Sequence, residues 1–238
     1  MDWDAFFTVH RELHREGPGL PEDVAWALAQ LGASPARVLD AACGPGADTQ
    51  TLARLLPDAS IDAVEKQAHF VDEARARLDV GRDRVRLWQG DMFDLSGAYD
   101  LIWCAGAAYF VGVTEALTRW RPRLAAGGFV AFSEPVLEAG ASDAAQAFWE
   151  EYPAITDRAG IEARVRTAGY APMASRLIQG AAWQAYYAPM EARIAALRAQ
   201  GVSAAVEAAC FENLAEAERW RAGQADIAYL LVVARPDP

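Results

Sequence analysis

Short apolar runs alternate with amphipathic stretches along most of the chain. From Val38 onward, continuous apolar segments are separated by segments in which apolar side chains recur every three or four residues. The first spacing is typical of buried strands, and the second is typical of helices with one apolar face. The pattern predicts strands at 37–41, 60–65, 84–88, 99–104 and 128–134, with helices at 47–56, 67–78 and 113–124 placed among them. Because strands and helices that alternate in this way form parallel βαβ units with right-handed crossovers, we expect a doubly wound α/β fold.

The segments on either side of this alternating region are predicted to be mostly helical. Residues 3–16 have helical periodicity, and a second helix is predicted to begin at Pro21 and to stop at Gly32. After Glu134 the pattern predicts an aromatic helical stretch that ends at Pro153, a helix at 158–168, a strand at 171–179, helices at about 182–200 and 202–221, and a last strand at 226–234. The expected result is a Rossmann-like, seven-stranded, mostly parallel sheet with an N-terminal helical region and a helical insertion before the last strand.

The composition favours one domain that acts on a small substrate. The chain has 238 residues, of which 53% are apolar, and this is enough for one sizeable core. Its formal charge is −11, from 33 acidic and 22 basic residues, and no basic tract interrupts the acidic background. A nucleic-acid substrate requires a concentrated positive patch, so DNA and RNA are disfavoured.

The N-terminus and the cysteines indicate a cytoplasmic protein without a metal centre. The opening MDWDAFF lacks the positive start and apolar core of a signal peptide, and no apolar run approaches the roughly 18 residues of a membrane span. Cys43, Cys104 and Cys210 are an odd number without C-x-x-C spacing, which suggests neither a disulfide framework nor a zinc site. His10 and His14 share a face of the predicted first helix, but no third ligand lies nearby in sequence, so no metal is expected.

The stretch VLDAACGPGADT, residues 38–49, combines a strand end with a tight glycine turn and two acidic residues. A strand, a glycine-rich turn and a helix commonly bind a nucleotide-like ligand, because backbone N–H groups and the helix N-terminus face the same crevice. The dinucleotide fingerprint G-x-G-x-x-G is broken here, since Thr49 takes the place of its third glycine. A carboxylate about 5 Å from a pyrophosphate would cost about 3 kcal/mol at an effective dielectric constant of about 20. Asp40 and Asp48 therefore favour a nucleoside ligand that carries positive charge.

These residues resemble the first motif of the class I S-adenosylmethionine-dependent methyltransferases, in which an acid precedes a Gly-x-Gly turn. The family's later landmarks follow in order: Glu65 closes the strand IDAVE, Asp91 and Met92 lie in QGDMF, Cys104 and Ala105 end a strand in AYDLIWCAGAAYF, and GGFVAFSEP resembles the fifth strand. The resemblance implies that S-adenosylmethionine is the cofactor, that Glu65 binds its ribose hydroxyls and that Asp91 binds its adenine amino group. The cofactor-binding residues that it implies are Asp40, Ala42, Gly44, Gly46, Glu65, Lys66, Asp91, Met92, Cys104 and Ala105.

Further segments are similar to a bacterial branch of small-molecule methyltransferases whose substrates are largely unassigned. These segments are FFTVHRELHREGPG, DLIW with GAAYFVG, FWEEYP and WQAYYAPMEARI. The similarity implies one domain over residues 1–238, with a helical lid at 1–34, a cofactor-binding core at 35–137, and substrate-side helices with the last two strands at 138–238. Arg15, in the turn after the first helix, is a candidate to bind the cofactor carboxylate; the alternative is a helix stop with a solvated arginine.

An acid behind the turn suits this cofactor, because the cofactor carries a sulfonium and an ammonium group. A carboxylate such as Glu65 can accept two hydroxyl hydrogen bonds, and hydrogen bonds to charged groups contribute about 1.5 to 3 kcal/mol each. Much of the acceleration of methyl transfer can come from alignment and water exclusion, so a dedicated base is not obligatory. Ala42 replaces the glycine that the family most often has, and we expect this residue to keep a negative φ.

The acceptor side is predicted from the strand ends and the inserted helices, which should cover the methyl donor. Glu134, at the end of the fifth strand, is the candidate base or amine anchor, and Tyr109 is the second catalytic candidate. The substrate-contact candidates are Trp183, Tyr186, Tyr187 and His14, whereas Trp149 and Tyr152 are interpreted as packing. For each aromatic candidate, packing in the core is the alternative.

The predicted function is methyl transfer to a small molecule by a monomer or homodimer, with the acceptor atom open. Two alternatives remain. One is a nicotinamide-dependent oxidoreductase on a related sheet, which Thr49 and the acids of the glycine turn oppose. The other is a cofactor-binding subunit without activity of its own.

Overall fold

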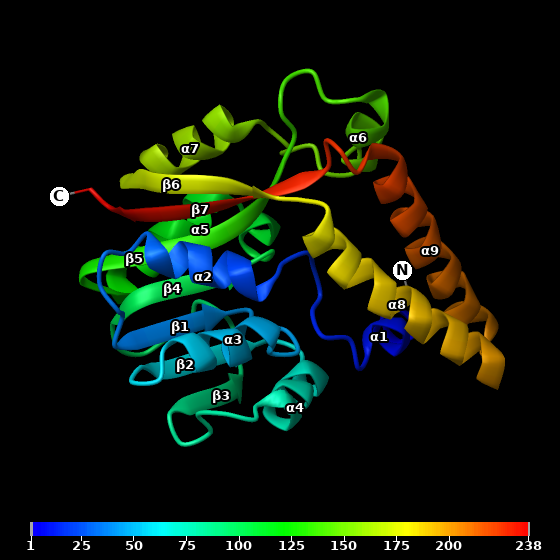
Figure 1. Cartoon of the computed structure of the whole chain (residues 1–238), viewed down its shortest axis with the longest axis horizontal. Coiled ribbons are helices and arrows are strands. Elements are labelled where there is room, and N and C mark those ends of the chain that lie inside the picture. The colour runs from blue at the N-terminus through cyan, green and yellow to red at the C-terminus, as the bar shows by residue number, and fades with distance from the viewer. Residues whose placement is uncertain (1, 238) are drawn as a thin grey trace.

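Seven strands form one sheet in the computed structural model, which describes residues 2–237 (Figure 1). The strands are β1 (Arg37–Ala41), β2 (Ser60–Glu65), β3 (Val85–Gln89), β4 (Tyr99–Ala105), β5 (Leu124–Val136), β6 (Tyr170–Ile178) and β7 (Ala228–Pro236). Their order is β3-β2-β1-β4-β5-β7-β6, and β7 is antiparallel to both of its neighbours while the other pairs are parallel. The predicted seven-stranded, mostly parallel sheet is confirmed. Met1 and Pro238, the ends of the predicted domain, lie outside the described residues.

Helices cover both faces of this sheet. They are α1 (Trp3–His10), α2 (Pro21–Ala29), α3 (Ala47–Leu55), α4 (Ala68–Arg77), α5 (Val113–Trp120), α6 (Asp143–Phe148), α7 (Arg158–Thr167), α8 (Ala181–Gln200) and α9 (Ala204–Gly223), with 3-10 turns at Ala108–Phe110 and Arg121–Arg123. α2 and α3 pack into the core on one face, and α5 and α7 pack into the core on the other. In β1, Val38 joins the first core and Leu39 the second, because successive side chains of a strand point to opposite faces. This two-sided burial explains the continuous apolar runs of the sequence.

The central strands are aligned so that their carboxyl ends meet at one edge of the sheet. Val38 of β1 pairs with Ile61 of β2, and Leu39 of β1 pairs with Ile102 of β4. The bounds of β1 and β2 agree with the predicted strands at 37–41 and 60–65. Residues that follow these strands are therefore brought together, although they are far apart in sequence.

The inserted helices α8 and α9 extend beyond the sheet and lie side by side (Figure 1). The buried side of α8 carries Trp183, Tyr187 and Met190, a spacing that places large side chains on one face of a helix. α1 packs against both helices. The predicted insertion between the last two strands is thus confirmed, and together with α1 it covers the carboxyl edge of the sheet.

The predicted helix at 3–16 is wrong beyond His10. The chain leaves the helix and turns at Glu12, which has a positive φ of 66°. The turn buries Leu13 and places its carbonyl 2.8 Å from a guanidinium nitrogen of Arg77, so tertiary contacts outweigh the helical periodicity. As a result, His10 and His14 do not share a helix face.

Among residues 2–237, no helix has both the length and the apolar character that crossing a membrane requires. The same part of the chain contains no group of three His, Cys, Asp or Glu side chains placed to hold a metal ion. Cys43, Cys104 and Cys210 are free thiols.

Candidate functional site

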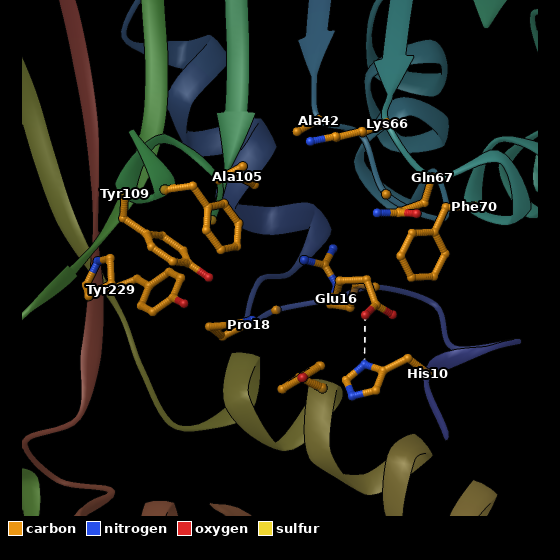
Figure 2. A pocket seen from close by; sticks show the side chains of 18 of the residues that line it. His10, Glu16, Pro18, Ala42, Lys66, Gln67, Phe70, Ala105, Tyr109 and Tyr229 are labelled. Atoms are coloured by element: carbon orange, nitrogen blue, oxygen red, sulfur yellow. Dashed lines mark hydrogen bonds and ion pairs between the residues drawn. The ribbon is translucent and has the colours of Figure 1, made fainter. Parts of the chain in front are cut away.

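A cavity of about 1240 Å³ lies at the carboxyl edge of the parallel strands (Figure 2). Its wall contains residues that follow β1, β2, β3 and β4, the segment after α1, and side chains of α6, α8, α9 and β7. Open α/β sheets bind their ligands at this edge. Because a pocket for one drug-sized ligand has about 300 to 1,000 Å³, the cavity has room for two small molecules.

The glycine turn after β1 forms part of this wall. The Gly44 N–H donates to Glu65 Oε2 over 3.0 Å, and the Gly46 N–H donates to the Cys43 carbonyl over 3.1 Å. Ala42 has a φ of 59°, so the prediction of a negative φ is wrong. The bonds that close the turn and join it to β2 hold this residue in the left-handed region, which costs a non-glycine residue about 1 to 2 kcal/mol.

Two aspartates of this motif have different surroundings. Asp40 is buried and accepts a hydrogen bond of 2.6 Å from the Thr49 hydroxyl. Burial, and then the nearby charge of Asp48, raise the pKa of Asp40 to about 8, so the carboxyl holds a proton at neutral pH. Asp48 instead accepts from the Arg15 guanidinium at 2.7 Å and from the Trp103 indole at 3.1 Å. A cation that enters beside Asp40 would favour loss of its proton.

Glu65 is the last residue of β2 and Asp91 follows β3, and both carboxylates accept hydrogen bonds from backbone N–H groups. The Glu65 carboxylate accepts from the N–H of Gly44 at 3.0 Å and from the N–H of Gln67 at 2.8 Å. Asp91 accepts from the N–H of Phe93 at 2.9 Å. Each carboxylate oxygen has more than one lone pair, so both side chains line the cavity with acceptor capacity left for a ligand.

Glu134 lies behind the cavity wall. Its side chain is completely buried, and one oxygen accepts a hydrogen bond of 2.8 Å from the Tyr152 hydroxyl, while the other has no hydrogen-bond partner. Burial raises the pKa of Glu134 to about 7, against the smaller effects of Tyr152 and of Arg164, whose guanidinium is 3.8 Å away. Tyr152 itself lines the cavity. Among the described residues, the hydrogen bond to Tyr152 links Glu134 to the cavity wall.

The sequence matches known methyltransferases over its central region. Residues 38–128 match a family model described as a methyltransferase domain. Trans-aconitate 2-methyltransferase from Rhodococcus jostii is 36% identical over 104 residues, which cover 43% of this chain and 39% of that protein. The enzyme of the same name from Streptomyces avermitilis is 29% identical over 143 residues, which cover 56% of this chain and 51% of that protein. The chain thus spans about half or less of the curated relatives it matches.

The fold is similar to that of solved methyltransferases over nearly the whole chain. An S-adenosylmethionine-dependent methyltransferase from Thiobacillus denitrificans, solved with S-adenosylhomocysteine, has a TM-score of 0.84 at 22% identity and matches 97% of both chains. Another from Geobacter sulfurreducens, also solved with S-adenosylhomocysteine, has a TM-score of 0.83 at 20% identity and matches 98% of both chains. The fold of this chain is therefore that of these methyltransferases, and residues 38–128 also match the sequence model of a methyltransferase domain.

The methyltransferase fold brings most of the predicted site residues to one cavity. On its wall lie Asp40, Ala42, Gly44, Glu65, Lys66, Asp91, Met92, Ala105, Arg15, Tyr109, Trp183 and Tyr186. Their individual roles stay predictions, but their common location agrees with the order of the motifs along the chain.

Five of the predicted site residues lie outside this wall. Gly46 packs against α4, and Cys104, a residue of β4, is fully buried in the core. Tyr187 is also fully buried and donates its hydroxyl to Glu216. Glu134 is covered as described above, and His14 is exposed in the loop after α1, where it contacts Arg77. Direct ligand contact is therefore not supported for these five, because buried packing or an outward-facing loop separates them from the cavity.

The structure also adds wall residues that the sequence did not single out. Trp149 and Tyr152, interpreted as packing, line the cavity, as do Glu16, Glu216 and Tyr229. For Trp149 and Tyr152, the aromatic segment FWEEYP was a signal in the sequence. Nothing in the alanine- and glutamate-rich sequence of α9 distinguishes Glu216 from the other glutamates of that helix.

Glu16 belongs to a series of hydrogen bonds that joins the segment after α1 to α9, of which Figure 2 shows the contact between Glu16 and His10. Its carboxylate is 2.7 Å from Nδ1 of His10, and Nε2 of the same ring is 3.0 Å from the side-chain oxygen of Asn213. Asn213 donates its amide nitrogen to the Ala209 carbonyl at 2.9 Å, which fixes the orientation of the amide. These hydrogen bonds hold the N-terminal segment against α9 beside the cavity.

Proposed function

We propose that this protein transfers a methyl group from S-adenosylmethionine to a small-molecule acceptor. The observation that carries the proposal is the large cavity whose wall brings together Asp40, Glu65 and Asp91, which lie at or near the carboxyl ends of successive parallel strands. This arrangement combines a place for an adenosyl cofactor with space beside it for an acceptor.

The side chains present fit this cofactor better than they fit a dinucleotide. The wall beside the glycine turn carries the carboxyls of Asp40, Asp48 and Glu65. Glu65, and Asp40 once it has lost its proton, would repel a pyrophosphate there and attract a sulfonium or an ammonium group, whereas the charge of Asp48 is offset by its ion pair with Arg15. Thr49 stands at the third glycine position of the dinucleotide fingerprint and donates its hydroxyl to Asp40, which opposes the nicotinamide alternative.

The residues of the chain have distinct proposed tasks. Glu65 accepts hydrogen bonds from the ribose hydroxyls, Asp91 accepts from the adenine amino group, and Met92 lies against the ring. Asp40 gives up its proton and faces the positive end of the cofactor. Tyr109, in the 3-10 turn that follows β4, borders the transferred methyl group.

Methyl transfer requires little further chemistry from the protein. When bound, S-adenosylmethionine supplies a methyl group on a positively charged sulfur, and the transfer leaves a neutral thioether. An acceptor lone pair forms the new bond to the methyl carbon as the carbon–sulfur bond breaks, and the acceptor's proton, where it has one, passes to solvent or to a nearby base. The chain aligns the acceptor and excludes water beneath α1, α8 and α9, which is a large part of the catalysis of such displacements.

The proposal extends to the domain organisation, the substrate class and the oligomeric state of the protein. Residues 1–238 act as one domain, in which 1–34 form a lid and 138–238 provide the acceptor side. The partner is a small metabolite and not a nucleic acid, since a formal charge of −11 without a basic tract gives phosphates no surface to bind. We further propose a cytoplasmic monomer or homodimer.

Labelled-methyl transfer tests this proposal. The purified protein is incubated with S-adenosylmethionine that carries an isotopic methyl label and with a small-molecule extract, and products are detected by mass. At least one extract component should gain the label, and a protein with Glu65→Ala should give far less product. Binding of the cofactor without labelled product from any extract would instead support the non-catalytic alternative.

A further inference from the structure

One end of the cavity is a box of aromatic rings around a carboxylate. Its walls are Tyr109 after β4, Trp149 after α6, Trp183 and Tyr186 on α8, and Tyr229 on β7, with Glu216 of α9 among them. We call these six residues the aromatic box. They come from five separate parts of the chain, so the fold itself assembles the box.

Three rings of the box, those of Trp149, Trp183 and Tyr229, pack closely against one another. The centroids of Trp183 and Tyr229 are 5.3 Å apart with nearly perpendicular planes, and Trp149 is 5.9 Å from Tyr229 and 6.1 Å from Trp183. Figure 2 shows the hydroxyl groups of Tyr109 and Tyr229 directed into the cavity. The indole N–H of Trp149 is buried without a hydrogen-bond partner, so the box contains a polar group that the protein itself does not satisfy.

Glu216 supplies the negative charge of the box. Its carboxylate accepts the Tyr187 hydroxyl at 2.8 Å, and within residues 2–237 no arginine, lysine or histidine forms an ion pair with it. Burial first, and then the charge of Glu216, raise the pKa of Tyr109 to about 12 and raise the pKa of Tyr186 well above its usual value. The field of this carboxylate therefore reaches the hydroxyls that surround it.

The positive side chains on the cavity wall do not offset this charge. Arg15 is paired with Asp48, and Lys66, Arg119 and Arg219 are exposed at the surface. An anionic group placed in the box would lose its hydration beside a carboxylate and gain no opposite charge. A cationic group would meet both a carboxylate and the negative faces of several rings, the arrangement by which aromatic cages hold ammonium groups.

We infer that the aromatic box binds a positively charged amine or quaternary ammonium group of the acceptor, with Glu216 as its counter-charge. The inference rests on the proposed function, because it assigns the acceptor side of the same cavity. It separates this chain from the relatives named trans-aconitate 2-methyltransferase, whose name specifies a polycarboxylate.

Two isosteric small molecules test the inference directly. Choline and 3,3-dimethylbutan-1-ol have the same shape and differ in one atom, a charged nitrogen against a neutral carbon. Each is titrated by calorimetry or ligand-observed NMR into protein saturated with S-adenosylhomocysteine, whose own binding is measured first. Choline should bind about tenfold tighter than the neutral alcohol or better, since it adds a charge-assisted contact and cation–π contacts.

Two variants of α9 test whether the preference for choline depends on the carboxylate of Glu216. Glu216→Gln keeps an oxygen for the Tyr187 hydroxyl but removes the charge, and it should weaken choline about tenfold while leaving the neutral alcohol and S-adenosylhomocysteine unchanged. Glu218→Gln removes the same charge from an exposed position of the same helix and should change neither ligand. This control separates the local contact from the overall charge of the protein.

The possible outcomes are distinct. Equal binding of choline and the alcohol, equal effects of Glu216→Gln and Glu218→Gln, or tight binding of trans-aconitate that Arg219→Ala abolishes would each overturn the inference while cofactor binding stands. Failure of S-adenosylhomocysteine to bind would overturn the proposed function, and the inference with it.

Discussion

Replacing either glycine of the turn by alanine should separate backbone strain from steric contact. Gly44 and Gly46 both have positive φ, 54° and 85°, so alanine is strained by about 1 to 2 kcal/mol at either position. A Cβ on Gly44 would have its nearest neighbour, Cγ of Glu16, at 3.8 Å, an ordinary contact. A Cβ on Gly46 would lie 2.7 Å from Cβ and 3.0 Å from Cα of Ala74 in α4.

The two substitutions should therefore have different costs. Alanine also restricts the unfolded chain, which returns about 0.4 to 1 kcal/mol at both positions, so Gly44→Ala should lower the free energy of unfolding by about 1 kcal/mol. Overpacking adds about 1 to 3 kcal/mol, so Gly46→Ala should lower it by about 2 to 4 kcal/mol. Urea unfolding followed by circular dichroism measures both values.

A double-mutant cycle identifies the contact. Ala74→Gly removes the Cβ at 2.7 Å but leaves the Cα at 3.0 Å, so it should recover part of the loss in Gly46→Ala, with a coupling energy of about 1 kcal/mol. Equal costs for the two alanine variants, or additive effects of Gly46→Ala and Ala74→Gly, would refute the steric reasoning.

Three further predictions concern the carboxylates. Glu65→Gln places an amide NH₂ against a backbone N–H and removes charged acceptors for the ribose. The affinity for S-adenosylhomocysteine, measured by calorimetry, should therefore fall by about tenfold to a hundredfold. Unchanged affinity would contradict this. Because cofactor binding should ionise Asp40, whose pKa is about 8, wild-type affinity should rise from pH 6 to pH 8 and then level off; an Asp40→Asn protein should lose this dependence, and a flat wild-type profile would count against the assignment. Between pH 4.5 and about 7, Glu134 holds a proton in the folded protein that the unfolded chain releases, so the free energy of unfolding should fall by about 3 kcal/mol as the pH rises. Glu134→Gln should remove this loss. Parallel curves of stability against pH for the wild type and the variant would contradict the prediction.

The sheet was predictable because buried parallel strands leave an unambiguous pattern. β1 and β2 have the predicted bounds, since continuous apolar runs between turn residues have few alternative structures. The helix at 3–16 was not predictable, because its periodicity continues past His10 while burial of Leu13 and its bond to Arg77 turn the chain away. A periodicity of nearby residues does not predict the end of this helix, because contacts with Arg77, distant in sequence, determine it.

The site was predictable as far as its motifs are local. Asp40, Glu65 and Asp91 each lie at or within two residues of the carboxyl end of a strand, and the topology of the sheet then brings them to one cavity. The φ of Ala42 depends on hydrogen bonds that join the turn to β2, which a pattern of residue types does not contain. No sequence motif predicted Glu216 as a site residue, because its proposed role depends on aromatic rings that other elements contribute.

Calorimetric titration of the wild-type protein with S-adenosylmethionine and, separately, with NADH tests the central claim most directly. The proposed cavity should bind one S-adenosylmethionine per chain and no NADH, because its carboxyls attract a sulfonium and repel a pyrophosphate. Tight binding of NADH without binding of S-adenosylmethionine would contradict the account.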